Sequence, residues 1–102
     1  MTIKALDLLD IRTIQLFVAV FEVGSITKAA EREHIAQPAL TVRLQQLEDE
    51  LNVKLFERST QGMTPMPAGR HFYGLCLDLL KRLDAWRKKQ TDSVSESVED
   101  GQ

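Results

Sequence analysis

The segment HIAQPALTVRLQQLEDELN, residues 34–52, carries the strongest helical pattern of the chain. Four leucines recur in it at spacings of 4, 3 and 4, which is typical of one face of an α-helix: Leu40, Leu44, Leu47 and Leu51. Pro38 suits the first position of this helix, where its missing N–H costs nothing and its φ is already helical. The pattern predicts a helix over residues 38–51 whose acidic residues come only in its second half.

Two shorter helices are predicted before this segment. Apolar residues at i, i+3, i+4 and i+7 predict a first helix over residues 11–23: Ile14, Phe17, Val18 and Phe21. Gly24 ends that helix, and Ser25 is suited to cap a second one that runs to about Glu33. The second helix and the helix over residues 38–51 therefore form a helix–turn–helix pair.

The hydrophobic period changes after Asn52. Residues 53–58 are a short extended run, residues 59–62 a turn and residues 63–65 a returning strand, with Pro65 allowed only at its end or edge. A long helix is expected from Pro67 to about Lys89. We therefore predict a mainly α fold: a winged helix–turn–helix with three helices and a two-stranded wing in residues 1–66, a linker or dimerisation helix in 67–90, and a disordered acidic tail in 91–102.

The charge of the chain is unevenly distributed. Residues 1–51 hold five Lys or Arg against eight acids, residues 52–90 hold eight against three, and residues 91–102 hold four acids, for a net charge of −2. Attraction to phosphate depends on local charge, and residues 52–90 carry an excess of basic side chains. A nucleic-acid partner is therefore compatible with the negative net charge of the chain.

Other classes of protein have little support. No apolar run approaches the length of a membrane span, and the N-terminal MTIKALDLLD lacks the pattern of a signal peptide, so we expect a cytoplasmic protein without a membrane partner. His34, His71 and Cys76 share no metal-ligand spacing, and neither a metal nor another cofactor is expected. No nucleophile–base pair or phosphate-binding glycine loop can be assembled, so an enzyme is not expected.

The helix over residues 38–51 is the candidate DNA reader. In a winged helix–turn–helix the second helix of the pair lies in the major groove, with its N-terminal residues facing base edges. With the leucines inward, its first turns present small and polar side chains: Gln37, Pro38, Ala39, Thr41, Val42, Arg43 and Gln46. Gln suits adenine, Arg suits guanine, and Thr or Val can touch a thymine methyl. The alternative is an ordinary solvated helix face.

Three further residues lie where DNA phosphates would come near. Arg58, in the wing, could reach a phosphate or the minor groove, or instead pair with Glu57 or an acid of the helix over residues 38–51. Ser25 and Thr27 stand at the start of the second helix, where a capping role and a phosphate contact are compatible.

The long helix contains a candidate dimerisation seam. Its apolar residues at spacings of 4, 3, 4 and 3 follow the 3.5-residue period of a coiled coil: Phe72, Cys76, Leu79, Leu83 and Trp86. The alternative for the first turns is packing against the chain's own domain, and Cys76 among leucines also fits a small buried apolar residue.

The segments LFVAVFEVGSITKAAE and HIAQPALTVRLQQLEDELNVKLFER, with PAG opening the long helix, closely resemble the N-terminal DNA-binding domain of LysR-type transcriptional regulators. The resemblance covers residues 10 to about 90. It implies a homodimer on an interrupted palindromic operator in double-stranded DNA, and a small-molecule effector only where a C-terminal effector domain exists. By position, it implies this DNA-facing set: Ser25, Thr27, Gln37, Pro38, Thr41, Val42, Arg43 and Arg58.

The sequence departs from the family pattern at four positions. Thr41 stands where Ser is usual, Gln61 where a wing arginine is common, and Met66 where a Thr usually precedes the long helix. Glu33 stands where the family places a core leucine, so its carboxylate must reach solvent or find a partner such as Arg32 or Lys54, and we expect below-average stability.

Two other functions remain open at this stage. A short dimerisation module could sequester a full-length regulator through the linker helix, without reading DNA itself. A different winged-helix class, such as the metal-oxyanion-sensing repressors, is a further alternative. Loss of function on changing Arg43 would favour DNA reading, and loss only on changing Leu83 would favour the module.

Overall fold

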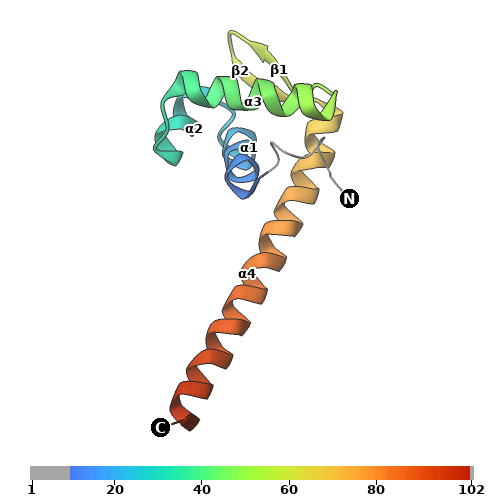
Figure 1. Cartoon of the computed structure of the whole chain (residues 1–102). Helices are drawn as coiled ribbons and strands as arrows, with labels where there is room; N and C mark the ends of the chain where they lie inside the picture. The colour runs from blue at the N-terminus through green and yellow to red at the C-terminus, as the bar shows by residue number, and fades with distance from the viewer. Residues whose placement is uncertain (1–9, 102) are drawn as a thin grey trace.

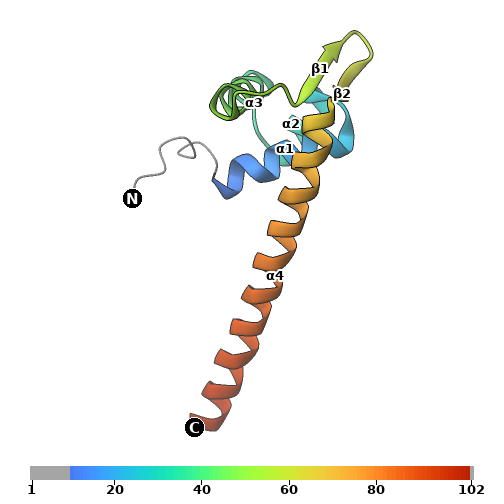
Figure 2. The same cartoon turned by 90° about the vertical axis from the view of Figure 1, so that its right-hand side faces the viewer.

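The computed structural model describes residues 10–101, with side chains up to Thr91. Its elements are, in order, α1 (Ile11–Val23), α2 (Ile26–Glu33), α3 (Gln37–Leu51), β1 (Phe56–Ser59), β2 (Gly62–Pro65) and α4 (Pro67–Gly101). Residues 10–66 form a head, from which α4 projects as a long rod (Figure 1). The view turned by 90° shows the same separation (Figure 2). The predicted winged helix–turn–helix with a following long helix is confirmed.

Local capping sets the bounds of the first two helices, which agree with the predicted ones. The Asp10 carboxylate accepts a hydrogen bond from the Thr13 amide at 2.7 Å and caps α1. Gly24 ends α1 in the left-handed region at φ 73°, where a residue without Cβ is favoured. The Ser25 hydroxyl then accepts from the Lys28 amide at 3.2 Å and caps α2.

Helix α3 begins at Gln37, one residue earlier than predicted. Ala36 precedes it without a side-chain cap, and Pro38 is therefore the second helical residue. This position costs no hydrogen bond either, because the first four amides of a helix have no intrahelical partner. Asn52 ends α3 in the left-handed region at φ 55°.

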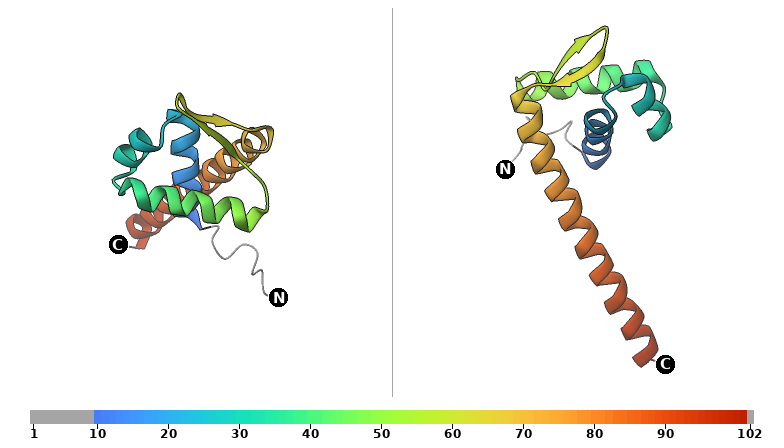
Figure 3. Two further views of the ribbon diagram at one scale, coloured as in Figure 1. Left: turned by 90° about the horizontal axis from the view of Figure 1, so that it is seen from above. Right: turned by 180° about the vertical axis from the view of Figure 1, so that it is seen from behind.

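The core is built around α1, which runs beneath α3 and beside α4 (Figure 3). Phe17 is fully buried, and its ring centroid lies 5.4 Å from that of Phe56 and 4.9 Å from that of Phe72. Leu40 and Leu47 of α3 are fully buried in the same cluster. One aromatic side chain of α1 thus joins the wing and α4 to a single core.

The wing is an antiparallel pair in which Phe56 faces Pro65 and Ser59 faces Gly62. Its first strand begins at Phe56. The sequence predicted a start three residues earlier, at Val53. The cause lies in α3, because the Glu48 carboxylate accepts hydrogen bonds from the amides of Leu55 at 2.7 Å and Phe56 at 3.2 Å. The connecting segment is therefore bound to α3 before the strand starts.

Helix α4 is longer than predicted. The sequence indicated an end near Lys89 and disorder over residues 91–102, but the backbone is helical to Gly101. Neither Gly nor Pro occurs between Gly74 and Gly101, and extending a helix is less costly than starting one. Gln102 and residues 1–9 lie outside the described residues. Among residues 10–101, no helix combines the length and apolar character that crossing a membrane requires.

Glu33 finds partners without entering the core. Its carboxylate lies 2.8 Å from a guanidinium nitrogen of Arg12 and 3.3 Å from Nε of Arg32, and 17% of its side chain is exposed. The sequence had suggested Arg32 but also Lys54, and it had missed Arg12. Because this carboxylate is paired and partly solvated, it does not carry the free-energy cost of an unpaired buried charge. Glu33 therefore gives no reason to expect below-average stability.

Gly69 and Gly74 offer a matched test of how α4 meets the head. A Cβ on Gly69 would lie 2.1 Å from the Leu55 carbonyl oxygen, which also accepts from the Met66 amide, whereas a Cβ on Gly74 would meet nothing within 4 Å. We expect Gly69→Ala to lower the free energy of unfolding by roughly 1–3 kcal/mol. Gly74→Ala should raise it by about 1 kcal/mol. Urea unfolding followed by circular dichroism measures both, and equal stability of the two variants would contradict this packing.

Candidate nucleic-acid interface

The exposed side of α3 lies opposite its buried leucines, at the end of the molecule away from the C-terminus of α4 (Figure 1). Gln37, Pro38 and Val42 are exposed there, and Val42 keeps 55% of its surface. The first turn of α3 contains no acidic residue, so its free amides and the positive end of the helix dipole are not offset locally. This surface suits a polyanion approaching the start of α3.

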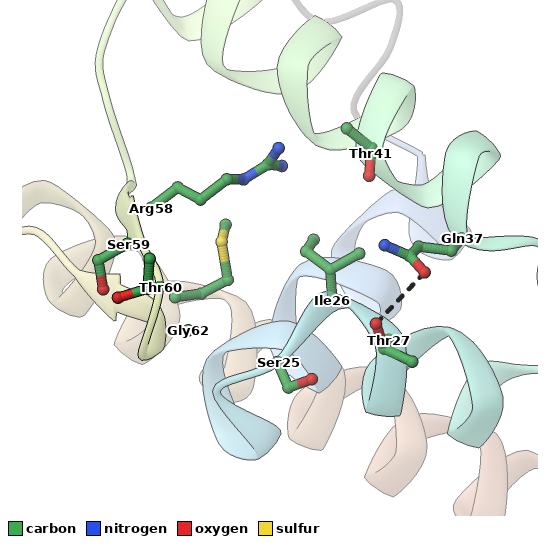
Figure 4. A pocket seen from close by; sticks show the side chains of 10 residues that line it. Ser25, Ile26, Thr27, Gln37, Thr41, Arg58, Ser59, Thr60 and Gly62 are labelled. Carbon is green, nitrogen blue, oxygen red and sulfur yellow. Dashed lines mark hydrogen bonds between the residues drawn. The ribbon is translucent and has the colours of Figure 1, made fainter.

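A hollow opens beside this surface, between the start of α2, the start of α3 and the wing (Figure 4). Five of the eight predicted DNA-facing residues line it: Ser25, Thr27, Gln37, Thr41 and Arg58. The Thr27 hydroxyl donates to the Gln37 side-chain oxygen at 3.2 Å, which links α2 to α3 across the turn. Sequence positions more than thirty residues apart are thus brought to one polar recess.

Arg58 reaches from β1 into the hollow toward α3 (Figure 4). Among the described residues, no ion pair joins it to Glu57 or to an acid of α3. The pairing that the sequence offered as its alternative is therefore not formed. The guanidinium is exposed and available to an anion.

The end of β1 and the wing turn add two hydroxyls that sequence reasoning missed. Ser59 and Thr60 line the hollow beside Arg58, and the Ser59 oxygen also accepts from the Gln61 amide at 3.2 Å. The sequence indicated only a turn there. The signal that could have found them is the pair of hydroxyl residues directly after a basic residue.

Arg43 is placed differently from the other predicted residues. Its guanidinium points back to α1, donating to the Thr13 hydroxyl at 2.8 Å and lying 3.5 Å from the Asp10 carboxylate. The hydrogen bond from the Thr13 amide, followed by the Thr13 side chain and the Arg43 charge, lowers the pKa of Asp10. Arg43 therefore ties the reading helix to the start of α1, and would have to leave these partners to reach a base.

The predicted dimerisation seam divides into two parts. Phe72 and Cys76 pack into the protomer's own core, and burial raises the pKa of the Cys76 thiol to about 11. Their assignment to the seam is corrected, because α4 lies against α1 here: Cys76 is buried and Phe72 is partly buried against the core. The exposed apolar face of α4 is made by Leu75, Leu79, Leu83 and Trp86.

The fold is that of a winged helix–turn–helix protein, and one side of α3, the second helix of the pair, faces solvent. The chain belongs to the LysR family of bacterial regulatory helix–turn–helix proteins, whose model matches residues 11–70. It is similar to the transcriptional regulator BenM of Acinetobacter baylyi, with 37% identity over 95 residues, which are 91% of this chain and 31% of BenM. It is also similar to the nitrogen assimilation regulatory protein nac of Escherichia coli, with 40% identity over 76 residues, 74% of this chain and 25% of nac. The chain therefore spans about a third or less of these relatives.

Two solved structures match most of the chain. The complex of the BenM DNA-binding domain with catB site 1 DNA superposes with a TM-score of 0.79 at 37% identity, covering 81% of this chain and 92% of that one. The complex of the CbnR DNA-binding domain with DNA gives a TM-score of 0.78 at 32% identity, covering 83% and 98%.

The Asp10 cap gives stability a defined pH dependence. Its pKa is lowered in the folded chain, so its charge stabilises fully above the unfolded pKa of about 3.9 and this contribution is lost as pH falls through the lower folded value. Asp10→Asn keeps a capping oxygen but removes the charge. In urea unfolding, the wild type should exceed Asp10→Asn in stability at neutral pH, and the difference should shrink toward about pH 3. A difference that is independent of pH would contradict the assignment.

Proposed function

We propose that the chain is a sequence-specific DNA-binding transcription regulator that acts as a homodimer on an interrupted palindromic operator. The observation that carries this proposal is the shared hollow, where residues of α2, α3 and the wing converge beside the exposed side of α3. Complexes of the BenM and CbnR domains with DNA support it. As a reader of bacterial DNA, the protein would act in the cytoplasm.

The two surfaces suit different parts of a DNA duplex. The hollow offers the Arg58 guanidinium together with the hydroxyls of Ser25 and the wing, which can donate hydrogen bonds to phosphate oxygens. The exposed side of α3 offers Gln37 and Val42, which suit an adenine edge and a thymine methyl in the major groove. The hollow would hold the backbone and so fix the register in which α3 meets the bases.

The second partner in the proposal is another copy of the chain. Leu75, Leu79, Leu83 and Trp86 leave 41–62% of their surfaces exposed along one side of α4, an unusually apolar face for an isolated helix. A matching helix from a second copy would cover it and place two heads on two half-sites.

The proposal assigns a binding role without a catalytic step, in line with the regulator names of the relatives. A small-molecule effector enters it only where this chain is joined to an effector-binding domain, as the family resemblance implies.

Arg58→Ala tests the phosphate contact. On a duplex selected by the wild type from a random library, we expect weaker binding and a salt dependence whose slope falls by about one, because one phosphate contact is lost. Lys89→Ala removes an exposed lysine of α4 that is remote from the hollow. This variant should leave the affinity and the slope of its salt dependence nearly unchanged. Fluorescence anisotropy at several salt concentrations measures this, and equal losses for the two variants would contradict the proposed site.

Leu83→Asp tests the homodimer. A carboxylate on the exposed face of α4 should prevent a second copy from burying it, and sedimentation should report monomers. Val53→Asp, at an exposed apolar residue between α3 and β1, is the matched control and should remain dimeric. A dimeric Leu83→Asp would rule out this face. Regulatory activity lost in Leu83→Asp but intact in Arg58→Ala would instead favour a module that sequesters another regulator.

A further inference from the structure

The head and α4 are joined by polar contacts as well as by the apolar packing of the core. From Pro67 to about Leu80, α4 packs against α1 through Phe72 and Cys76. Farther along, Leu83 and Trp86 still line a recess with Ile11 of α1, and α4 extends away from the head as a rod (Figures 1 and 2). Apolar packing of this kind holds a helix in place, but it is non-directional and tolerates small changes of tilt.

A chain of five polar side chains crosses this joint: Arg12, Glu33, Arg32, Glu22 and Tyr73. Within it, a guanidinium nitrogen of Arg12 lies 2.8 Å from Glu33, and Nε of Arg32 lies 3.3 Å from the second Glu33 oxygen. Arg32 also donates to Glu22 at 3.0 Å, and the Tyr73 hydroxyl donates to the other Glu22 oxygen at 2.8 Å. Cations and anions alternate, and the chain joins α1, α2 and α4.

Tyr73 is held in two directions at once. Its ring stacks on Phe21 with centroids 3.9 Å apart and planes 5° apart, while its hydroxyl is bound by Glu22. This hydrogen bond raises the pKa of Tyr73 and lowers the pKa of Glu22, so at neutral pH a protonated phenol meets an ionised carboxylate. Hydrogen bonds to a charged group are the stronger and more directional kind. A rotation or tilt of α4 would disturb both contacts.

We propose that the Tyr73–Glu22 hydrogen bond is an angular lock that sets the direction in which α4 leaves the head. In a dimer joined through α4, that direction fixes the distance between the two α3 helices and hence the half-site spacing that the protein accepts. The inference rests on the proposed DNA-binding homodimer. Tyr73 and Glu22 act as positioning residues, because both lie outside the hollow and the exposed side of α3.

The test compares operator spacings. The probes are the duplex selected by the wild type, the same duplex with one or two base pairs inserted between its half-sites, and a single half-site. For the wild type, wrong spacing should cost up to about 100-fold in affinity, because simultaneous engagement of both heads is lost. Tyr73→Phe keeps the stacked ring but loses the hydroxyl, and should reduce this penalty at least about threefold.

Half-site affinity separates positioning from a merely structural role. We expect Tyr73→Phe and Glu22→Leu to bind the single half-site as the wild type does. Arg82→Gln is the control, since it breaks an ion pair with Asp78 that lies wholly within α4; its spacing penalty should match the wild type. The lock would be overturned if Tyr73→Phe showed the same spacing penalty as the wild type. It would also be overturned if the variant lost affinity equally for every probe, including the single half-site.

A second measurement remains decisive even if the wild type binds no duplex, an outcome that would refute the proposed function alone. Spin labels on Lys28→Cys and Lys89→Cys report the distance between the head and α4 in protomers diluted with unlabelled chain. Both positions are exposed, whereas the buried Cys76 thiol should resist labelling. Tyr73→Phe should broaden the distance distribution, and Arg82→Gln should not. A distribution as narrow as that of the wild type would overturn the lock.

Discussion

Leu40, Leu44 and Leu47 bury one side of α3 against the cluster around Phe17, and this contact determines which side of the helix meets solvent. A helix with one apolar side has little freedom to turn about its axis, because rotation would expose that side to water. The side bearing Val42 is outward for this reason. The direction in which the exposed side of α3 faces is therefore a consequence of core packing, and no further interaction is needed to orient it.

The same helix also positions the wing. Glu48 lies on α3 beyond the reading turns, and its carboxylate binds the two amides that lead into β1. The wing is pinned at its other end as well, where the Met63 amide donates to the Gly24 carbonyl at 3.2 Å. Arg58 is thereby placed beside α3, in the lining of the hollow. Three hydrogen bonds from two separate parts of the chain thus position the wing beside the hollow.

Much of this arrangement could be predicted from sequence because it depends on local signals. Periodic apolar residues and capping residues gave the bounds of α1 and α2, and the change of period gave the wing. The convergence of Thr27, Gln37 and Arg58 followed from the helix–turn–helix pattern with a wing. These features depend on spacing along the chain, which the sequence displays directly.

The features that could not be predicted depend on partners distant in sequence. Arg43 is held by Thr13, thirty residues before it, and no spacing rule connects them. The 3.5-residue pattern of α4 identified an apolar helix correctly, but it could not tell which apolar residues face α1 and which face outward. For that reason Cys76 was placed in the seam as well as being interpreted as a small buried apolar residue, and the second interpretation is confirmed. Side-chain pairing across elements is decided by the packed fold, which periodicity does not contain.

We propose that DNA contacts the start of α3 and the wing, and that it does not contact the basic residues 81–89 of α4. Amide chemical-shift mapping by nuclear magnetic resonance, during titration with the selected duplex, tests it most directly. We expect the largest shifts around Thr27, over residues 37–42 and over residues 58–60, and small shifts over residues 81–89. Large shifts confined to residues 81–89, with the hollow unperturbed, would contradict it.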